Sequence, residues 1–282
     1  QNNTFLDSSS NAFAITRNGN TTQGSFTPFS CASTAWGNYL NGSTDYMVVS
    51  GSGGSANFTF GTSTDFTIES WFYMTTVTGD TNYRTIFSNY GGGAGSAILG
   101  MWLSGGVPKF RGLWNTVDIV GTTTLQANTW YNFSFARSGS TFRLFLNGNL
   151  EGSATGSVSA DGGNNWDIGL IPNASEAGHF AGYISNLRVV KGGALYTAAY
   201  TPATSPLTTT VSAGTVSLLT CQSNRFIDNS SNGYAITLTG TPSVQAFSPF
   251  APQYQWTPSV IGGSGYFDGS ASTYLTVPNS SN

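Results

Sequence analysis

The chain has 282 residues, of which 39% are hydrophobic, 14% are aromatic and only 7% are charged, and its net charge is −3. A chain of this length and apolar content can bury a sizeable core, which argues against intrinsic disorder. The nine Lys and Arg residues form no basic cluster, and no apolar run reaches the roughly 18–20 residues of a membrane helix. We therefore expect no nucleic-acid partner and no membrane insertion.

Short runs rich in aromatic and β-branched residues follow one another along the chain, separated by Gly, Ser and Asn, and predict β-strands. Ser-Gly-Ser at 138–140 predicts a hairpin, and Asn147 with Gly148 predicts the next tight turn, because both residues tolerate positive φ. Many strands without helical patterns indicate an all-β sandwich or jelly roll. In chain order, the expected strands cover residues 65–74, 84–90, 97–103, 129–137, 141–148, 166–171, 182–190 and 216–221.

The beginning of the chain is repeated near its end. Residues 1–29 (the N-terminal signature) match residues 222–250 (the C-terminal signature) at an offset of 221 (226 − 5 = 221), with 14 of 29 positions identical. About two identities are expected by chance on ordinary composition. Residues 39–49 match 266–277 at an offset that begins at 227. A repeat of this length is a whole domain. We therefore predict a domain at 1–215 and, at 216–282, the first strands of a second, incomplete repeat.

Four motifs in sequence order, FTIESWFY, TWYNFSFARSGSTFRLFLNG, FAGYISNLRVVKGGALYT and TPATSPL, resemble those of laminin G-like, concanavalin A-like jelly rolls over residues 1–215. The connecting sequence LLTCQSNRFIDNSSNGYAIT, followed by AFSPF and YFDGSASTYLTV, is similar to laminin G-like repeats in virion and tail-fibre proteins of marine bacteriophages, particularly those of cyanobacteria. The resemblance implies a sandwich of two antiparallel sheets.

The resemblance also implies an extracellular structural or adhesion module, carried on the virion surface as part of a fibre, a tail or a capsid decoration. Its expected partners are other copies of itself, other virion proteins and host-surface glycans. Two alternatives stay open: a calcium-dependent, lectin-like carbohydrate binder, and a bacterial cell-surface filament protein assembled by strand addition.

In this family, the strand that precedes the signature lies beside the last strand of the domain. We therefore expect residues 216–221 to fill that edge, either in their own domain or in another subunit by strand addition. The alternative explanation of the repeat is that the chain is a section of a longer array.

The sequence contains few candidate catalytic residues. Glycosidases on related jelly rolls need two carboxylates close together, often from alternate residues of one strand. The three glutamates are Glu69, Glu151 and Glu176, and none has another carboxylate two residues away. The single histidine, His179, is expected in a loop, and no serine lies in a nucleophile elbow. We therefore predict that the chain is not an enzyme.

Sugar binding would use exposed aromatic rings, which pack on the apolar face of a sugar while Asn and Asp take its hydroxyl groups. Trp114 and Trp166 lie at strand–loop borders among polar residues, and Asn165 adjoins Trp166. These three residues are the candidate ligand-binding site, with burial of both rings in the core as the alternative. The tryptophans expected in the core, within apolar strands, are Trp71, Trp102 and Trp130.

Calcium binds through oxygen ligands, and the loop ADGGNNWDIG brings Asp161, Asn164 and Asp167 close together in sequence. The alternative is that these side chains cap their own backbone in Asx turns, and it applies equally to Asp228 and Asn232 of the C-terminal signature.

Only two cysteines occur, Cys31 and Cys221, too few for a disulfide scaffold or a zinc site. They are either two free buried thiols or one disulfide.

Overall fold

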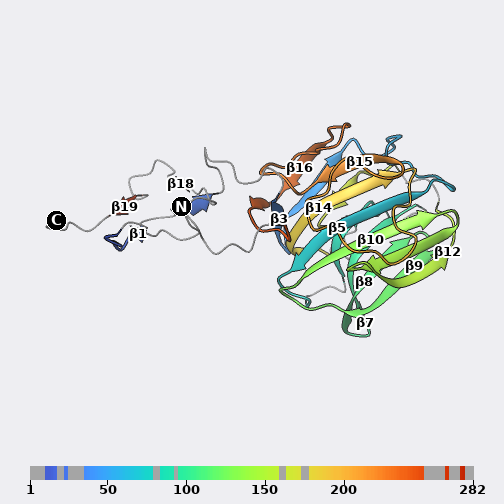
Figure 1. The fold of residues 1–282 in the computed structure, drawn as a ribbon, viewed down its shortest axis with the longest axis horizontal. Coiled ribbons are helices and arrows are strands. Elements are labelled where there is room, and N and C mark those ends of the chain that lie inside the picture. The colour runs from blue at the N-terminus through green and yellow to red at the C-terminus, as the bar shows by residue number, and fades with distance from the viewer. Residues whose placement is uncertain are drawn as a thin grey trace.

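The computed structural model describes residues 10–17, 22–24, 35–78, 83–91, 95–158, 163–172, 178–250, 264–266 and 274–276. These residues form antiparallel β-strands in two large sheets (Figure 1). No helix able to cross a membrane occurs among them. The expected all-β sandwich is confirmed.

The eight-stranded sheet contains most of the aromatic strands that the sequence predicted. Figure 1 shows four of its strands, β3, β14, β5 and β10, side by side across the sandwich. β15 pairs with β14 beside this path. In spatial order the strands are β12 (Asn149–Thr155), β11 (Thr141–Leu146), β10 (Trp130–Ser138), β5 (Phe66–Met74), β14 (Ala181–Lys191), β3 (Gly37–Asn41) and β17 (Ser243–Gln245), with β15 (Thr215–Thr220).

The seven-stranded sheet packs against the first. It includes β8 and β9, which contain charged and polar residues and were not among the strands expected. In spatial order its strands are β16 (Ala235–Thr239), β4 (Tyr46–Ser50), β13 (Trp166–Ile168), β6 (Tyr83–Ser88), β7 (Ala97–Ser104), β8 (Val107–Trp114) and β9 (Val117–Thr124).

The predicted hairpin joins β10 and β11, with Ser138 opposite Thr141. Gly139 has a φ of 59°, and Asn147 and Gly148 have φ values of 49° and 79°. These backbone angles are the reason that the turns need Gly or Asn. The local chemistry of the sequence is therefore sufficient to predict both turns.

Strand pairing continues across the predicted boundary between residues 215 and 216. β15 pairs with β14, and its register joins Leu187 with Thr220. Residues 216–220 therefore fill an edge of their own sandwich, beside the strand that the family resemblance implied. β16 then pairs with β4, and β17 pairs with β3. The C-terminal signature thus adds a strand to each sheet.

Two small ribbons complete the list of strands. β1 (Thr16–Arg17) pairs with β19 (Leu275–Thr276), and β2 (Thr22–Gly24) pairs with β18 (Ser264–Tyr266). In Figure 1, β1, β18 and β19 lie together beside the sandwich rather than within it.

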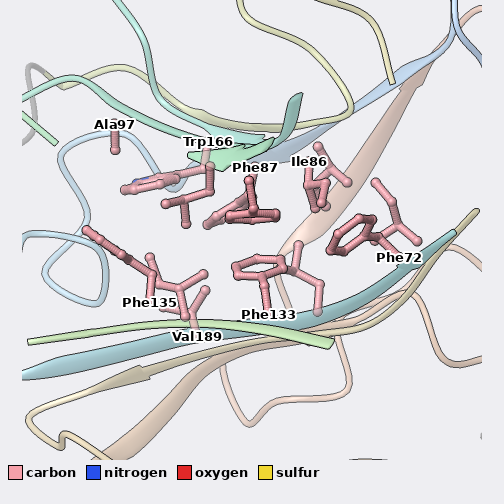
Figure 2. Packing of buried hydrophobic residues seen from close by; sticks show 14 of the residues in the cluster. Phe72, Ile86, Phe87, Ala97, Phe133, Phe135, Trp166 and Val189 are labelled. Carbon is pink, nitrogen blue, oxygen red and sulfur yellow. The ribbon is translucent and has the colours of Figure 1, made fainter. Parts of the chain in front are cut away.

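The core lies between the two sheets, where alternate side chains of each strand meet. Figure 2 shows Trp166 and Phe87 pointing from the seven-stranded sheet toward Phe133 and Phe135 of the eight-stranded sheet. Trp166 stacks on Phe87 with ring centroids 4.6 Å apart. Full burial of one such side chain stabilises the fold by about 1.5–3 kcal/mol, so these aromatic pairs hold the sheets together.

Candidate functional site: an aromatic row on the eight-stranded sheet

The two tryptophans predicted to bind ligand lie in the core. Trp114 and Trp166 are both fully buried, and their rings lie 5.5 Å apart. Trp114 also packs on Phe66 of β5 in the opposite sheet and on Phe60, which lies between β4 and β5. The prediction that these two rings are exposed is therefore wrong. The reason is strand parity: both residues fall on the inward-facing positions of β8 and β13.

The three tryptophans expected in the core, Trp71, Trp102 and Trp130, are instead partly exposed. Trp71 and Trp130 lie in β5 and β10 of the eight-stranded sheet, and Trp102 lies in β7 of the other sheet. All three occupy positions that alternate with buried residues, so their side chains lie on the outer faces of the sheets.

An aromatic row crosses the outer face of the eight-stranded sheet. Trp130 lies opposite Tyr73, Tyr73 opposite Tyr183, and Tyr183 opposite Tyr39. Successive ring centroids are 5.5, 5.9 and 5.0 Å apart. All four side chains are partly exposed. With neighbouring strands about 4.8 Å apart, the row extends over roughly 14 Å.

Phe247 of the C-terminal signature lies against the middle of the aromatic row. Its ring centroid is 4.6 Å from Tyr183, 5.0 Å from Tyr73 and 5.3 Å from Trp130, and the residue is still 36% exposed. Phe250 packs edge-on against Trp71 at 5.6 Å. The row and Phe247 together form a contiguous aromatic surface.

The row also carries hydrogen-bonding groups. The Tyr183 hydroxyl donates to Oε1 of Gln245 at 3.2 Å. Burial, followed by the neighbouring Tyr39 and Tyr73, raises the pKa of Tyr183, so its phenol stays protonated and able to donate. A surface with ring faces and polar edges suits a ligand that is itself amphipathic.

Part of this outer face is covered by the segment that follows β14. Tyr196 donates to Glu69 Oε2 at 3.0 Å, and Tyr200 donates to Asn132 Oδ1 at 2.8 Å. Arg188 donates to Glu69 Oε1 from Nε at 2.9 Å and from Nη2 at 2.7 Å. These contacts cover Glu69 and Asn132, and the aromatic row lies on the part of the face that this segment leaves open.

The described glutamates have structural partners. Glu69 is 1% exposed and is bound by Arg188 and Tyr196. Glu151 accepts hydrogen bonds from the backbone N–H and the hydroxyl group of both Thr122 and Thr123, and these bonds lower its pKa against the effect of burial. Both carboxylates are therefore engaged in contacts within the fold. Glu176 lies outside the described residues.

Two further polar residues bear on catalysis. Asp65, four positions before Glu69, accepts a hydrogen bond from Gly139 N at 2.8 Å and so supports the β10–β11 hairpin. His179 lies outside the strands, as expected, with its ring 6.4 Å from Tyr46. Neither residue adds a catalytic partner to the aromatic row.

The predicted calcium loop is described only in part, because Asp161 lies outside the described residues. Asn164 and Asn165 are exposed, and Asn165 Oδ1 accepts from Gly53 N at 3.0 Å. Burial raises the pKa of Asp167 to about 7, which opposes the ionised carboxylate that calcium needs. In the described part of the chain, no three acidic, His or Cys side chains lie close enough together to hold a metal ion. These residues fit calcium poorly, and the metal site stays a prediction.

The Asp-x-Ser-x-Asn motif of the C-terminal signature caps a strand edge. Asp228 accepts from Leu219 N at 3.0 Å, from Ser230 N at 2.8 Å and from Tyr234 N at 3.0 Å. Asn232 donates from Nδ2 to Ser217 O at 2.9 Å. These bonds satisfy backbone groups along the outer edge of β15, which is the Asx-type capping that the sequence left open.

Cys221 is a free thiol with 1% exposure, and burial raises its pKa to about 12. Cys31 lies outside the described residues, so a disulfide between the two stays a prediction.

Comparison with known proteins agrees with the fold. A family model described as the concanavalin A-like lectin/glucanases superfamily, of the laminin G type, matches residues 41–198. A search of curated proteins found no match.

Two solved structures resemble the sandwich. The first is a putative carbohydrate-binding protein from Bacteroides ovatus, with a TM-score of 0.54, 14% identity, and coverage of 76% of this chain and 60% of that one. The second is the heptameric SAP-like pentraxin of Limulus polyphemus, with a TM-score of 0.50, 14% identity, and coverage of 77% and 97%. At these identities the likeness shows the fold alone. The family match covers more than half of the sequence, and the chain therefore belongs to the laminin G-like branch of the concanavalin A-like lectin/glucanases superfamily.

Proposed function

We propose that this chain is a non-enzymatic, extracellular adhesion module that binds glycans on its aromatic row. The observation that carries the proposal is the row itself: four partly exposed rings lie side by side across four strands on the outer face of a sheet. Outer faces of antiparallel sheets are normally polar, so contiguous exposed aromatics mark a binding surface.

The chemistry of the row suits a carbohydrate. The C–H face of a sugar ring packs on an aromatic ring, and the tyrosine hydroxyls and Gln245 offer partners for the sugar hydroxyls. Charged groups are absent from the row, so a neutral oligosaccharide fits better than a phosphorylated ligand. The carbohydrate-binding neighbour among the solved structures agrees with this choice.

The proposed setting is the surface of a phage virion, where copies pack together as part of a fibre, a tail or a capsid decoration and contact host-surface glycans. The similarity of the signatures to marine phage repeats supports this placement. The low charge content also agrees with a marine exterior, because at high ionic strength charged surfaces contribute little. Mass spectrometry of purified virions tests the placement, and recovery of its peptides only from bacterial cell surfaces would contradict it.

A glycan array followed by calorimetric titration of the best-binding oligosaccharide tests the binding function. Trp130→Ala and Tyr183→Ala are expected to weaken binding about tenfold or more, equivalent to about 1.4 kcal/mol. Trp102→Ala is the matched control, because Trp102 is a partly exposed tryptophan on the other sheet. Binding that survives Trp130→Ala but is lost in Trp102→Ala would place the site on the seven-stranded sheet and refute the proposal.

A further inference from the structure

The C-terminal signature closes the sandwich at several points. β16 and β17 add a strand to each sheet, and Asp228 caps β15. Tyr234 packs edge-on against Phe58 with ring centroids 5.4 Å apart, and its hydroxyl lies 2.5 Å from Ser55 Oγ. Phe247 and Phe250 then lie on the outer face. This segment is therefore a closing segment for a laminin G-like unit.

The N-terminal signature keeps most of the residues that make these contacts, with Phe13 at the position of Tyr234. Phe226, Asp228, Ser230, Asn232, Ile236, Thr237, Phe247 and Phe250 correspond to Phe5, Asp7, Ser9, Asn11, Ile15, Thr16, Phe26 and Phe29. Two exposed positions that differ are Arg225 and Leu238, which correspond to Thr4 and Arg17. The positions that hold the sandwich closed are thus among those that the two signatures share.

Backbone conformation is also shared where both signatures are described. Gly233 has a φ of 59°, and its equivalent Ala12 has a φ of 49°. A positive φ is unusual for alanine and is adopted here at the same step of the same turn. The turn that leads into β16 therefore also leads into β1.

The first ribbon repeats the pairing of the sandwich. Thr22 of β2 pairs with Tyr266 of β18. Their equivalents at offsets of 221 and 227, Ser243 and Tyr39, pair with each other in the eight-stranded sheet. β2 and β18 are therefore related as β17 and β3 are.

The second ribbon repeats the other pairing. Thr16 of β1 pairs with Thr276 of β19. The segment 266–277 is one residue longer than its counterpart 39–49, so its offset rises to 228 toward its end. The equivalents of this pair, Thr237 and Val48, pair in the seven-stranded sheet. Both ribbons therefore reproduce the registers in which β17 and β16 of the C-terminal signature pair with β3 and β4.

We propose that the segments on either side of the sandwich form a self-association junction, in which the N-terminal signature of one copy pairs with the β18 and β19 strands of another copy. The partner is a second copy of this chain. Each copy has one half of the junction before its sandwich and the other half after it, so pairing between copies is heterologous and continues head to tail. In the described part of the chain, β1 and β2 pair with β19 and β18 of the same copy and with no strand of the sandwich. The pairing therefore needs no contact with the sandwich, and another copy can supply the same strands.

This inference deepens the packing of copies that the proposed function contains, but it is independent of glycan binding. Loss of the junction leaves the glycan titration unchanged, and loss of glycan binding leaves the junction intact. The two ideas therefore fail separately.

Cysteine cross-linking of the full chain tests the junction, with Cys31→Ser as the background. One protein carries Thr16→Cys and the other carries Thr276→Cys, and the two are mixed under mild oxidation. We expect a disulfide-linked heterodimer, identified by peptide mass, and a ladder of longer species from the double variant. A double variant that yields only monomers with an internal disulfide would overturn the proposal, because it would show that the ends pair within one copy.

The matched control is Val48→Cys with Thr237→Cys, the equivalent pair inside the sandwich, which must give an internal disulfide and no ladder. A second variant, Gln23→Pro, removes the backbone N–H of residue 23 and disfavours the pairing of β2 with β18. We expect it to lower the mass measured by light scattering and to leave the melting temperature of the sandwich unchanged. An unchanged mass in Gln23→Pro would also count against the junction.

Discussion

The capping carboxylate of the C-terminal signature offers the clearest test of how the sandwich is closed. Asp228 is 9% exposed and accepts hydrogen bonds from three backbone N–H groups, of Leu219, Ser230 and Tyr234, and from the Ser230 hydroxyl. In Asp228→Ala these donors lose a charged acceptor. Each such loss costs about 1–2 kcal/mol, so the expected decrease in the free energy of unfolding is about 3–5 kcal/mol.

Urea unfolding followed by tryptophan fluorescence measures this change, and the melting temperature should fall by roughly 10 °C. Asp118→Ala is the control: its carboxylate is 2.7 Å from Arg111 Nη2, but its side chain is 43% exposed, so we expect a cost of about 1 kcal/mol or less. If Asp228→Ala costs no more than Asp118→Ala, the motif does not hold the sandwich closed and the capping argument fails.

Three further predictions concern buried groups. Arg188→Met leaves Glu69 buried without its partner and should cost about 3–5 kcal/mol in urea unfolding, whereas Arg188→Met with Glu69→Leu should recover most of that loss; equal costs would refute the role of the pair. Cys221 should react with a thiol reagent only after unfolding, because burial raises its pKa to about 12; fast labelling of the native protein would contradict this. The pKa of Asp167 rises from 3.8 to about 7 on folding, so the native state holds a proton that the unfolded state has lost between these values. Stability should therefore fall by up to about 4 kcal/mol as pH rises from about 4 to about 7, and Asp167→Asn should remove that part of the pH dependence, as unfolding at several pH values would show.

The sequence contains a signal for the position of the candidate site, although the prediction that Trp130 is buried does not use it. In TWYNFSFAR, the residues Tyr131, Phe133 and Phe135 occupy one face of the strand, while Trp130 is in phase with Asn132 and Ser134. An aromatic residue in phase with polar ones lies on the outer face. Predicting burial from the apolar character of the whole run hid this signal, which strand parity would have revealed.

Other parts of the candidate site are not readable from one strand. Tyr39, Tyr73, Trp130 and Tyr183 become neighbours only because β3, β14, β5 and β10 are adjacent in the sheet. Phe247 reaches the same row from a segment more than sixty residues after Tyr183. Sequence order alone does not give this spatial order, since β5 pairs with β14 and not with the strands beside it in the chain.

Strands, turns and fold class are predictable from short stretches of sequence, because residue alternation and the positive φ of Gly and Asn are properties of a few neighbouring residues. Asn147 and Gly148 form the turn that their chemistry requires, and residues 216–220 form the strand that their apolar run predicts. The repeat was also visible directly, as 14 identities in 29 positions.

Which strands each repeated signature pairs with depends on contacts between residues far apart in the sequence. Both signatures have the same Asp-x-Ser-x-Asn motif and equivalent strand registers, yet β16 joins β4 across nearly 190 residues while β1 joins β19 at the other end of the chain. Which strands the C-terminal signature joins, and which tryptophans remain exposed, follows from how the two sheets bury their apolar faces against each other. That burial is a property of the assembled sandwich, because no single strand contains the surface against which it packs.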